Sequence, residues 1–160
     1  MTRREIREEI FKLLFTVEFH EEDDREEQLE LFMEEVSEEP ESAENDKVDE
    51  DSEEIEFEEP LSNDVQKDKE YIQEKYNDIL SHLDEIDATL NKKVEKWKTT
   101  RMPKVDLTIL RLAVYEILFE EDIPEKVAIN EAVELAKKYG SDKSGGFVNG
   151  ALSKVIKNEE

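Results

Sequence analysis

The sequence predicts an all-α protein. Apolar residues recur three or four positions apart through most of the 160 residues, which is the period of a helix with one buried face. No stretch shows the alternation of apolar and polar residues that is typical of a half-buried strand. From Leu107 to Phe119 only three positions are polar or charged, and a helix that is apolar nearly all round belongs at the centre of a bundle.

Two helices are expected before residue 38. Thr2 and Glu5 have the spacing of a capping box, so the first helix is expected to begin at the N-terminus. Asp23 or Asp24 is placed to cap the second helix. The apolar positions of the first helix are Ile6, Ile10, Phe11, Leu13, Leu14, Phe15, Val17 and Phe19, and those of the second are Leu29, Phe32, Met33 and Val36.

The segment from Glu38 to Glu59 is predicted to be a mobile acidic insert. Between Glu34 and Glu59 the chain has 15 Asp or Glu residues and one Lys, a net charge of −14 out of −24, which leaves −10 for the rest. Such a segment cannot bury enough apolar surface to offset the entropy lost on ordering. Its acids do not have the spacing of a calcium-binding loop. We expect the insert to be dispensable for folding, with Ile55, Phe57 and Leu61 able to attach its end.

Helical periodicity resumes after Ser62. An apolar stripe runs from Ile72 to Val94, with an expected break near 82–84 that makes two helices. Pro103 ends this region, and Asp106 is expected to cap the central helix.

Two more helices are expected after a turn at 122–124. The first ends at Gly140, where we expect a left-handed C-cap, and Ser144 is expected to cap the last helix. We expect an N-terminal helical subdomain over residues 1–61, which includes the insert, and a C-terminal helical subdomain over residues 62–160.

Neither catalysis nor membrane insertion is expected from the composition. The chain has no cysteine, so disulfides and thiolate metal sites are excluded. No apolar run approaches the roughly 20 residues that span a bilayer, and no signal segment follows Met1, so we expect a cytoplasmic protein. No P-loop or dinucleotide-binding glycine motif occurs, and neither His20 nor His82 belongs to a catalytic arrangement. We expect no catalytic residue, no cofactor, no metal and no small-molecule substrate.

Several blocks resemble the NusB family of transcription antitermination factors. The run ILRLAVYE at 109–116 resembles the family's central helix, and VAINEAVELAK at 127–137, after Ile123-Pro124, resembles its next helix. Ser144, the block FVNG at 147–150 and Leu152 resemble the last helix. Arg3, Arg4, Arg7 and Glu8 resemble the N-terminal arginine motif. The C-terminal resemblance extends over residues 97–156.

The resemblance implies two helical subdomains packed side by side. It also implies binding to boxA RNA in leader transcripts of ribosomal RNA operons, as a heterodimer with NusE, a small-subunit ribosomal protein. The pair would act in the transcription elongation complex and keep RNA polymerase elongating. The resemblance places the NusE contact near Asp106.

The candidate RNA-binding surface combines the N-terminal arginines with the loop before the last helix. A guanidinium group binds phosphate with two hydrogen bonds and stacks on bases. Paired glycines expose backbone N–H groups at a helix N-terminus, where anions bind, although they also simply relieve crowding. The following Phe could stack on a base or belong to the core. The candidate RNA-binding residues are Arg3, Arg4, Arg7, Lys143, Ser144, Gly145, Gly146 and Phe147.

Other polar and aromatic residues receive structural interpretations. Arg111 and Glu116 on the central helix are expected to pair or to reach solvent. Asn130 and Asn149 are expected to be buried amides that link helices, and Trp97 to be a packing anchor. Two cationic groups are interpreted either as solvated helix faces or as part of an RNA surface. The first group is Lys92, Lys93, Lys96, Lys98, Arg101 and Lys104, and the second is Lys137, Lys138, Lys143, Lys154 and Lys157.

Two alternatives stay open at this stage. The overall charge of −24, with Glu5 inside the arginine motif and Phe15 where the family often has Tyr, favours a helical protein-interaction adaptor with little RNA affinity. The second alternative is the NusB-like domain at the N-terminus of certain RNA methyltransferases, which requires more chain than 160 residues.

Overall fold

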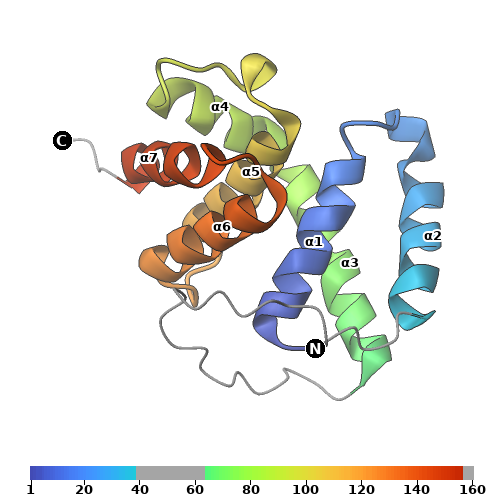
Figure 1. Cartoon of the computed structure of the whole chain (residues 1–160). Coiled ribbons are helices and arrows are strands. Elements are labelled where there is room, and N and C mark those ends of the chain that lie inside the picture. Colours follow the sequence, from blue (N-terminus) through green and yellow to red (C-terminus); the bar gives the residue numbers. More distant parts are fainter. Residues whose placement is uncertain (39–63, 157–160) are drawn as a thin grey trace.

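The computed structural model describes residues 1–38 and 64–156, and it confirms the all-α prediction for them (Figure 1). The expected mobile insert at 38–59 lies almost wholly outside the described residues. No helix in the described ranges is long and apolar enough to cross a membrane. The helices are α1 (Arg3–Thr16), α2 (Arg25–Glu38), α3 (Val65–Ser81), α4 (Leu83–Lys93), α5 (Lys104–Phe119), α6 (Glu125–Tyr139) and α7 (Ser144–Ile156), with 3₁₀ turns η1 (Glu22–Asp24) and η3 (Thr99–Arg101).

Local sequence signals explain where several helices begin and end. At α1 the predicted capping box is present: the Thr2 hydroxyl accepts from the Glu5 N–H, and the Glu5 carboxylate accepts from the Thr2 N–H, both at 3.1 Å. The predicted break between the two middle helices is confirmed at His82, which ends α3 and precedes α4.

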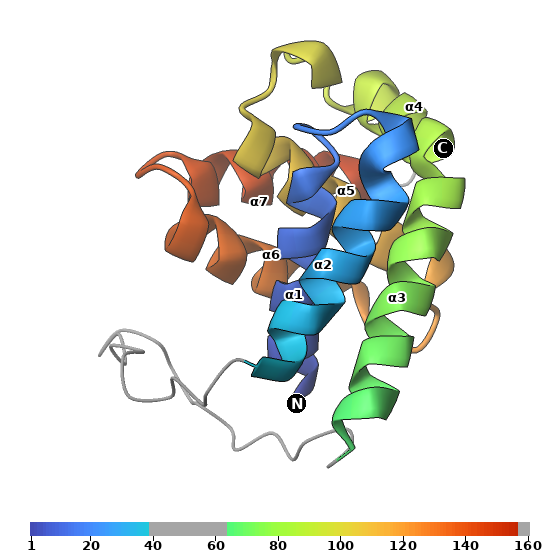
Figure 2. The ribbon, with the colours of Figure 1, turned by 90° about the vertical axis from the view of Figure 1, so that its right-hand side faces the viewer.

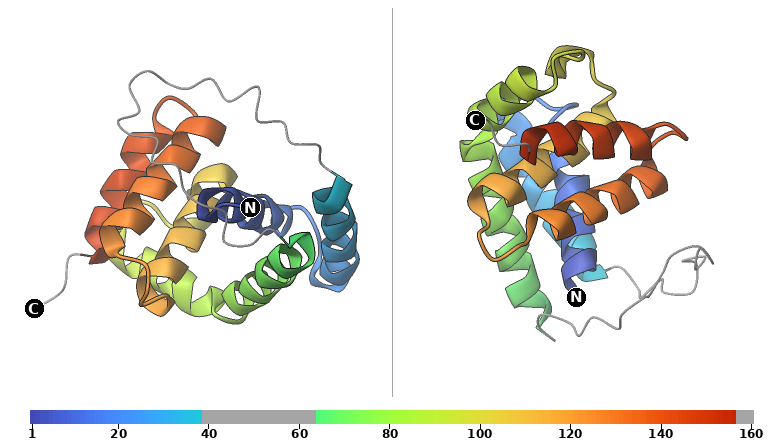
Figure 3. Two further views of the ribbon diagram at one scale, coloured as in Figure 1. Left: turned by 90° about the horizontal axis from the view of Figure 1, so that it is seen from below. Right: turned by 90° about the vertical axis from the view of Figure 1, so that its left-hand side faces the viewer.

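The central helix α5 organises the bundle, as its apolar sequence predicts. It packs against α1, α4, α6 and α7, and Ile109, Leu110 and Val114 are completely buried. Figure 3 shows α6 and α7 lying side by side over α5. A helix surrounded in this way can carry a charged side chain only where a neighbouring helix supplies its counterpart.

The helices form two groups around this centre. Helices α1, α2 and α3 pack on one another, as Figure 2 shows, and α4 packs with α5 and α7. Contacts between α1 and α5 join the groups. Because α3 belongs with α1 and α2, the packing favours a subdomain boundary at His82, and we propose that boundary in place of residues 61 and 62.

Three predicted helix caps are wrong. The N-cap of α5 is Pro103, and Asp106 is the third residue of the helix. Gly140 has φ −94° and ψ −167°, which is extended rather than left-handed. Ser144 is the first residue of α7, and its hydroxyl accepts from the Ser141 N–H at 2.9 Å instead of capping the helix.

Close packing explains the glycine at position 140. A Cβ there would lie 2.4 Å from the Ser144 hydroxyl oxygen and 2.8 Å from the Ala136 carbonyl oxygen. The loop can therefore fold back onto the end of α6 only if position 140 has no side chain. Gly150, within α7, has open space around it.

We predict that Gly140→Ala lowers the free energy of unfolding by about 2 kcal/mol or more, because the loop must move to admit the methyl group. Gly150→Ala is the matched control, and it should raise stability by up to about 1 kcal/mol because alanine has the higher helix propensity. Urea denaturation followed by circular dichroism measures both. Equal stability of the two variants would contradict the close-packing explanation.

Candidate nucleic-acid interface

The three N-terminal arginines occupy different environments on α1. Arg3 is exposed and forms no ion pair within the described residues. Arg4 is 56% exposed and binds Glu131 of α6 through two hydrogen bonds of 2.9 and 3.0 Å. Arg7 is only 11% exposed, and its Nε donates to Glu116 of α5 at 2.6 Å. Exposure to a ligand therefore falls from Arg3 to Arg7.

Arg7 lies where α1, α5 and α6 meet. Its guanidinium group faces Glu116 and also lies 3.7 Å from Glu131. Burial raises the pKa of Glu116 above its ordinary value, and the Arg7 guanidinium offsets only part of that effect. The ion pair confirms the prediction that Glu116 is paired within the fold. It also shows that Arg7 joins α1 to α5, a structural role that the sequence pattern did not indicate.

A cavity of about 440 Å³ adjoins this junction between the two helix groups. Arg3 of α1 and Tyr71 of α3 line it from one helix group, and Val127 of α6 lines it from the other. Lys75, which also lines it, forms an ion pair with Glu120. Arg3 is thus the cation of this cavity that has no ion pair within the described residues.

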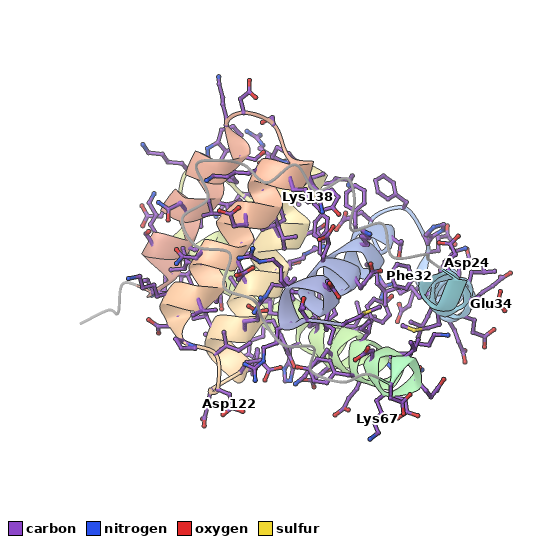
Figure 4. All side chains as sticks on the ribbon, turned by 60° about the horizontal axis from the view of Figure 1, so that its bottom comes forward. Asp24, Phe32, Glu34, Lys67, Asp122 and Lys138 are labelled. Atoms are coloured by element: carbon purple, nitrogen blue, oxygen red, sulfur yellow. The ribbon has the colours of Figure 1, made fainter. Side chains whose placement is uncertain are left out.

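The end of α6 is fixed against α1 by Glu8. Lys138 pairs with the Glu8 carboxylate at 2.8 Å, and the Tyr139 hydroxyl donates to it. Burial would raise the pKa of Glu8, but these two partners outweigh it, so the pKa lies below its ordinary value. Figure 4 shows Lys138 where α6 approaches α1. This contact holds the loop before α7 on the same side of the molecule as α1.

The residues predicted in that loop do not all face solvent. Lys143 and Gly146 are exposed, whereas Ser144 is buried and bonded to Ser141. A Cβ on Gly145 would contact the side chain of Lys137 at 3.7 Å, whereas Gly146 has open space around it. Each glycine therefore fits one of the two interpretations. Gly145 relieves crowding against α6, and Gly146 leaves the backbone at the start of α7 open to a ligand.

Phe147 is half-buried, and its ring meets Trp97 edge-on with the centroids 6.2 Å apart. Trp97, predicted to be a packing anchor, packs on Phe147, but 47% of its side chain is exposed. Asn130 and Asn149 are exposed as well, so the prediction of buried amides is wrong. The sequence did contain a signal for Trp97, since lysines precede and follow it, but periodicity alone could not separate an anchor from a surface ring.

The segments that carry this aromatic contact also carry exposed cations without an ion pair in the described residues. Most of the cations on α1, α5 and α6 are paired with acids. In contrast, several exposed cations at the end of α4, in the α4–α5 connection, and before or within α7 form no ion pair within residues 1–38 and 64–156. They are Lys92, Lys96, Lys98, Arg101, Lys143 and Lys154.

Asp106, the predicted partner-binding residue, lies in the first turn of α5 and is only 5% exposed. Its Oδ1 atom is buried and has no hydrogen-bond partner within the described residues. Within the residues that the structure describes, no group of three or more His, Asp or Glu side chains is arranged to hold a metal ion.

These features define an all-helical protein of two packed helix groups that presents cations and aromatic rings where loops cross its C-terminal helices. The chain belongs to the NusB family, whose family model matches residues 4–157. It is 49% identical to the transcription antitermination protein NusB of Agathobacter rectalis over 154 residues, which are 96% of this chain and 98% of that protein.

Solved structures share the fold. Thermotoga maritima NusB is 36% identical, with a TM-score of 0.74 over 99% of this chain and 93% of that one. A chain from a crystal structure of the antitermination factors NusB and NusE in complex with double-stranded RNA is 24% identical, with a TM-score of 0.71 over 97% of this chain and 96% of that one.

We predict that Arg7→Gln lowers the free energy of unfolding by about 3 kcal/mol at neutral pH, because it leaves Glu116 buried without its cation. The loss should shrink as the pH falls toward about 5, since a carboxyl with a raised pKa takes up its proton more readily in the folded state. Arg4→Gln, which removes an exposed partner of Glu131, should cost at most about 1 kcal/mol.

Thermal and denaturant unfolding at both pH values test this difference, and adding Glu116→Gln to Arg7→Gln should restore part of the stability. Equal and small losses for Arg4→Gln and Arg7→Gln would show that the buried pair does not join the helix groups.

Proposed function

We propose that this chain is a transcription antitermination factor that binds boxA-type RNA as a heterodimer with NusE and helps RNA polymerase to continue elongation. The observation that carries the proposal is the 49% identity, along nearly the whole chain, to a protein named transcription antitermination protein NusB. The proposed function is performed in the cytoplasm, where bacterial transcription takes place, and it includes no catalysis.

We propose that the RNA lies across the start of α1 and the loop from Lys143 to Phe147. The exposure of Arg3, Arg4, Lys143 and Gly146 supports direct contact with RNA. Burial of Arg7 and Ser144 supports a different contribution, in which these two candidate residues hold the surfaces that carry the contacts. Gly145 adjoins α6 and supports the loop in the same way.

The electrostatics favour joint binding with NusE. RNA affinity depends largely on cations that neutralise phosphates, and a protein of charge −24 with a few separated cations can neutralise only a few of them. A basic ribosomal partner extends the positive surface. The structure that contains NusB, NusE and double-stranded RNA is an assembly of this composition, formed by a protein with the same fold.

The second candidate function is a protein-interaction adaptor with little RNA affinity. The pairing of Arg4 and Arg7 with Glu131 and Glu116 favours it, because RNA phosphates must compete with these carboxylates. A pull-down with the purified chain, using boxA RNA and NusE separately and then together, distinguishes the two functions. Retention of NusE without RNA in the combined experiment would support the adaptor.

We predict that Arg3→Ala with Arg4→Ala weakens RNA binding by the NusE heterodimer several-fold and lowers the salt dependence by about one unit for each lost phosphate contact. The loss should be about equal for matched and scrambled RNA, since phosphate contacts position the RNA without reading its sequence. Lys67→Gln is the control for charge removal, because Figure 4 shows Lys67 on the side of α3 away from α1. Filter binding at matched salt measures each variant, and parental affinity in the double variant would show that the RNA lies elsewhere.

We predict that Asp106→Asn weakens NusE binding about ten-fold without lowering stability. The Oδ1 atom of Asp106 is buried and unpartnered in the free chain, so it can accept a hydrogen bond from NusE only after the start of α5 rearranges on binding. The carboxylate has no N-cap role to lose, because Asp106 is the third residue of α5. Isothermal titration calorimetry with NusE and thermal unfolding of the free chain are the two measurements. Unchanged NusE affinity would remove Asp106 from the interface.

A further inference from the structure

The connection between α4 and α5 presents an aromatic ring on a rigid support. Val94 and Met102 are buried at its two ends, and Thr99 is buried between them. The Thr99 N–H donates to the Asn91 side chain at 2.9 Å, and the Arg101 N–H donates to the Lys98 carbonyl at 2.9 Å. The segment is therefore fixed at several points along its length.

Trp97 lies within this fixed segment, yet 47% of its side chain is exposed. Its backbone N–H donates to the Val94 carbonyl at 3.3 Å, and its ring meets the edge of Phe147 at an interplanar angle of 82°. The two contacts limit the motion of the indole while about half of its surface stays open. An amphipathic ring held in this way can stack on a planar ligand without a large loss of side-chain entropy.

Charge decides which planar ligand the surface fits. Lys96 and Lys98 flank Trp97, and Lys143 is exposed next to the start of α7; none of them forms an ion pair within the described ranges. Cations that follow a backbone, combined with rings that stack on bases, are the features of proteins that bind single-stranded nucleic acid. A basic ribosomal protein would be repelled by the same lysines.

We propose that Trp97 stacks on an unpaired base of the RNA and that Lys96 and Lys98 hold the adjacent phosphates, so that the RNA path continues from Phe147 over the α4–α5 connection. This inference rests on the proposed function and extends its surface to a segment outside the arginine motif and the loop before α7. It specifies single-stranded RNA, because a base must leave its partner to lie flat on an indole ring.

Trp97 is the only tryptophan of the chain, so its fluorescence reports directly on the stacking. The NusE heterodimer is titrated with single-stranded boxA RNA and, separately, with the same RNA annealed to its complement. A heterodimer that carries Trp97→Phe has no tryptophan in this chain, so its fluorescence gives the background that comes from NusE. This background is subtracted from the signal of the parent heterodimer. We expect single-stranded RNA to quench the Trp97 emission, over the concentrations at which filter binding shows the complex to form, and the duplex to quench it much less.

Variants test the affinity. Trp97→Ala should weaken single-stranded RNA binding about ten-fold, and Trp97→Phe should retain most of the affinity because it keeps an aromatic face. Lys96→Gln with Lys98→Gln should lower the salt dependence by about one to two units. Two control variants should leave RNA binding unchanged. Leu118→Ala removes another large apolar side chain that is 42% exposed, and Lys67→Gln removes a positive charge on α3.

The outcomes separate this inference from the proposed function. If the heterodimer binds RNA without quenching of Trp97, and Trp97→Ala binds as tightly as the parent, the inference is wrong and the proposed function stands. Failure of the heterodimer to bind RNA at all overturns both. If Trp97→Ala weakens NusE binding and leaves RNA binding intact, the surface is a protein interface and the inference is wrong. If circular dichroism shows that Trp97→Ala is unfolded, the affinity of this variant is not used. Quenching of Trp97 fluorescence in the parent heterodimer by single-stranded RNA then supports the inference, and absence of quenching overturns it.

Discussion

The fold depends on neutralising the polar groups of a central helix that is buried by its neighbours. Glu116 of α5 receives Arg7 from α1, and Arg111 of α5 donates to Asp87 of α4 at 2.8 and 2.9 Å. Tyr115 of α5 donates to Asp78 of α3. Because an unpaired charge in such a place would destabilise the protein strongly, these contacts fix α1, α3 and α4 in register against α5.

Pairing in the interior also determines which charges remain for a ligand. Arg111 shares Glu18 with Lys104, and the pKa of Glu18 lies below its ordinary value because these cations outweigh the effect of burial. The cations on α1, α5 and α6 are largely used in this way. The net charge of the chain consequently says little about RNA, since a ligand meets mainly the cations that the fold has not paired.

Several cations without an ion pair in the described residues lie in the α4–α5 connection and just before α7, among them Lys96, Lys98 and Lys143. The contact between Trp97 and Phe147 brings these two segments together. Trp97 lies outside regular helix and Phe147 lies in the first turn of α7, and each segment contains a buried residue, Thr99 in one and Ser144 in the other. A rigid loop that carries lysines offers a more open approach to a polyanion than a helix face whose charges are already paired.

The sequence by itself determined the helices and the family. Apolar periodicity, the capping box at Thr2 and the break at His82 are local features, because each depends on residues within a few positions of one another. Only the tertiary structure distinguished Arg3 from Arg7, which have the same side chain on the same helix, because the partner of Arg7 lies 109 positions away. The extended conformation of Gly140 and the half-exposed ring of Trp97 were likewise decided by contacts with other segments, and no local pattern records those contacts.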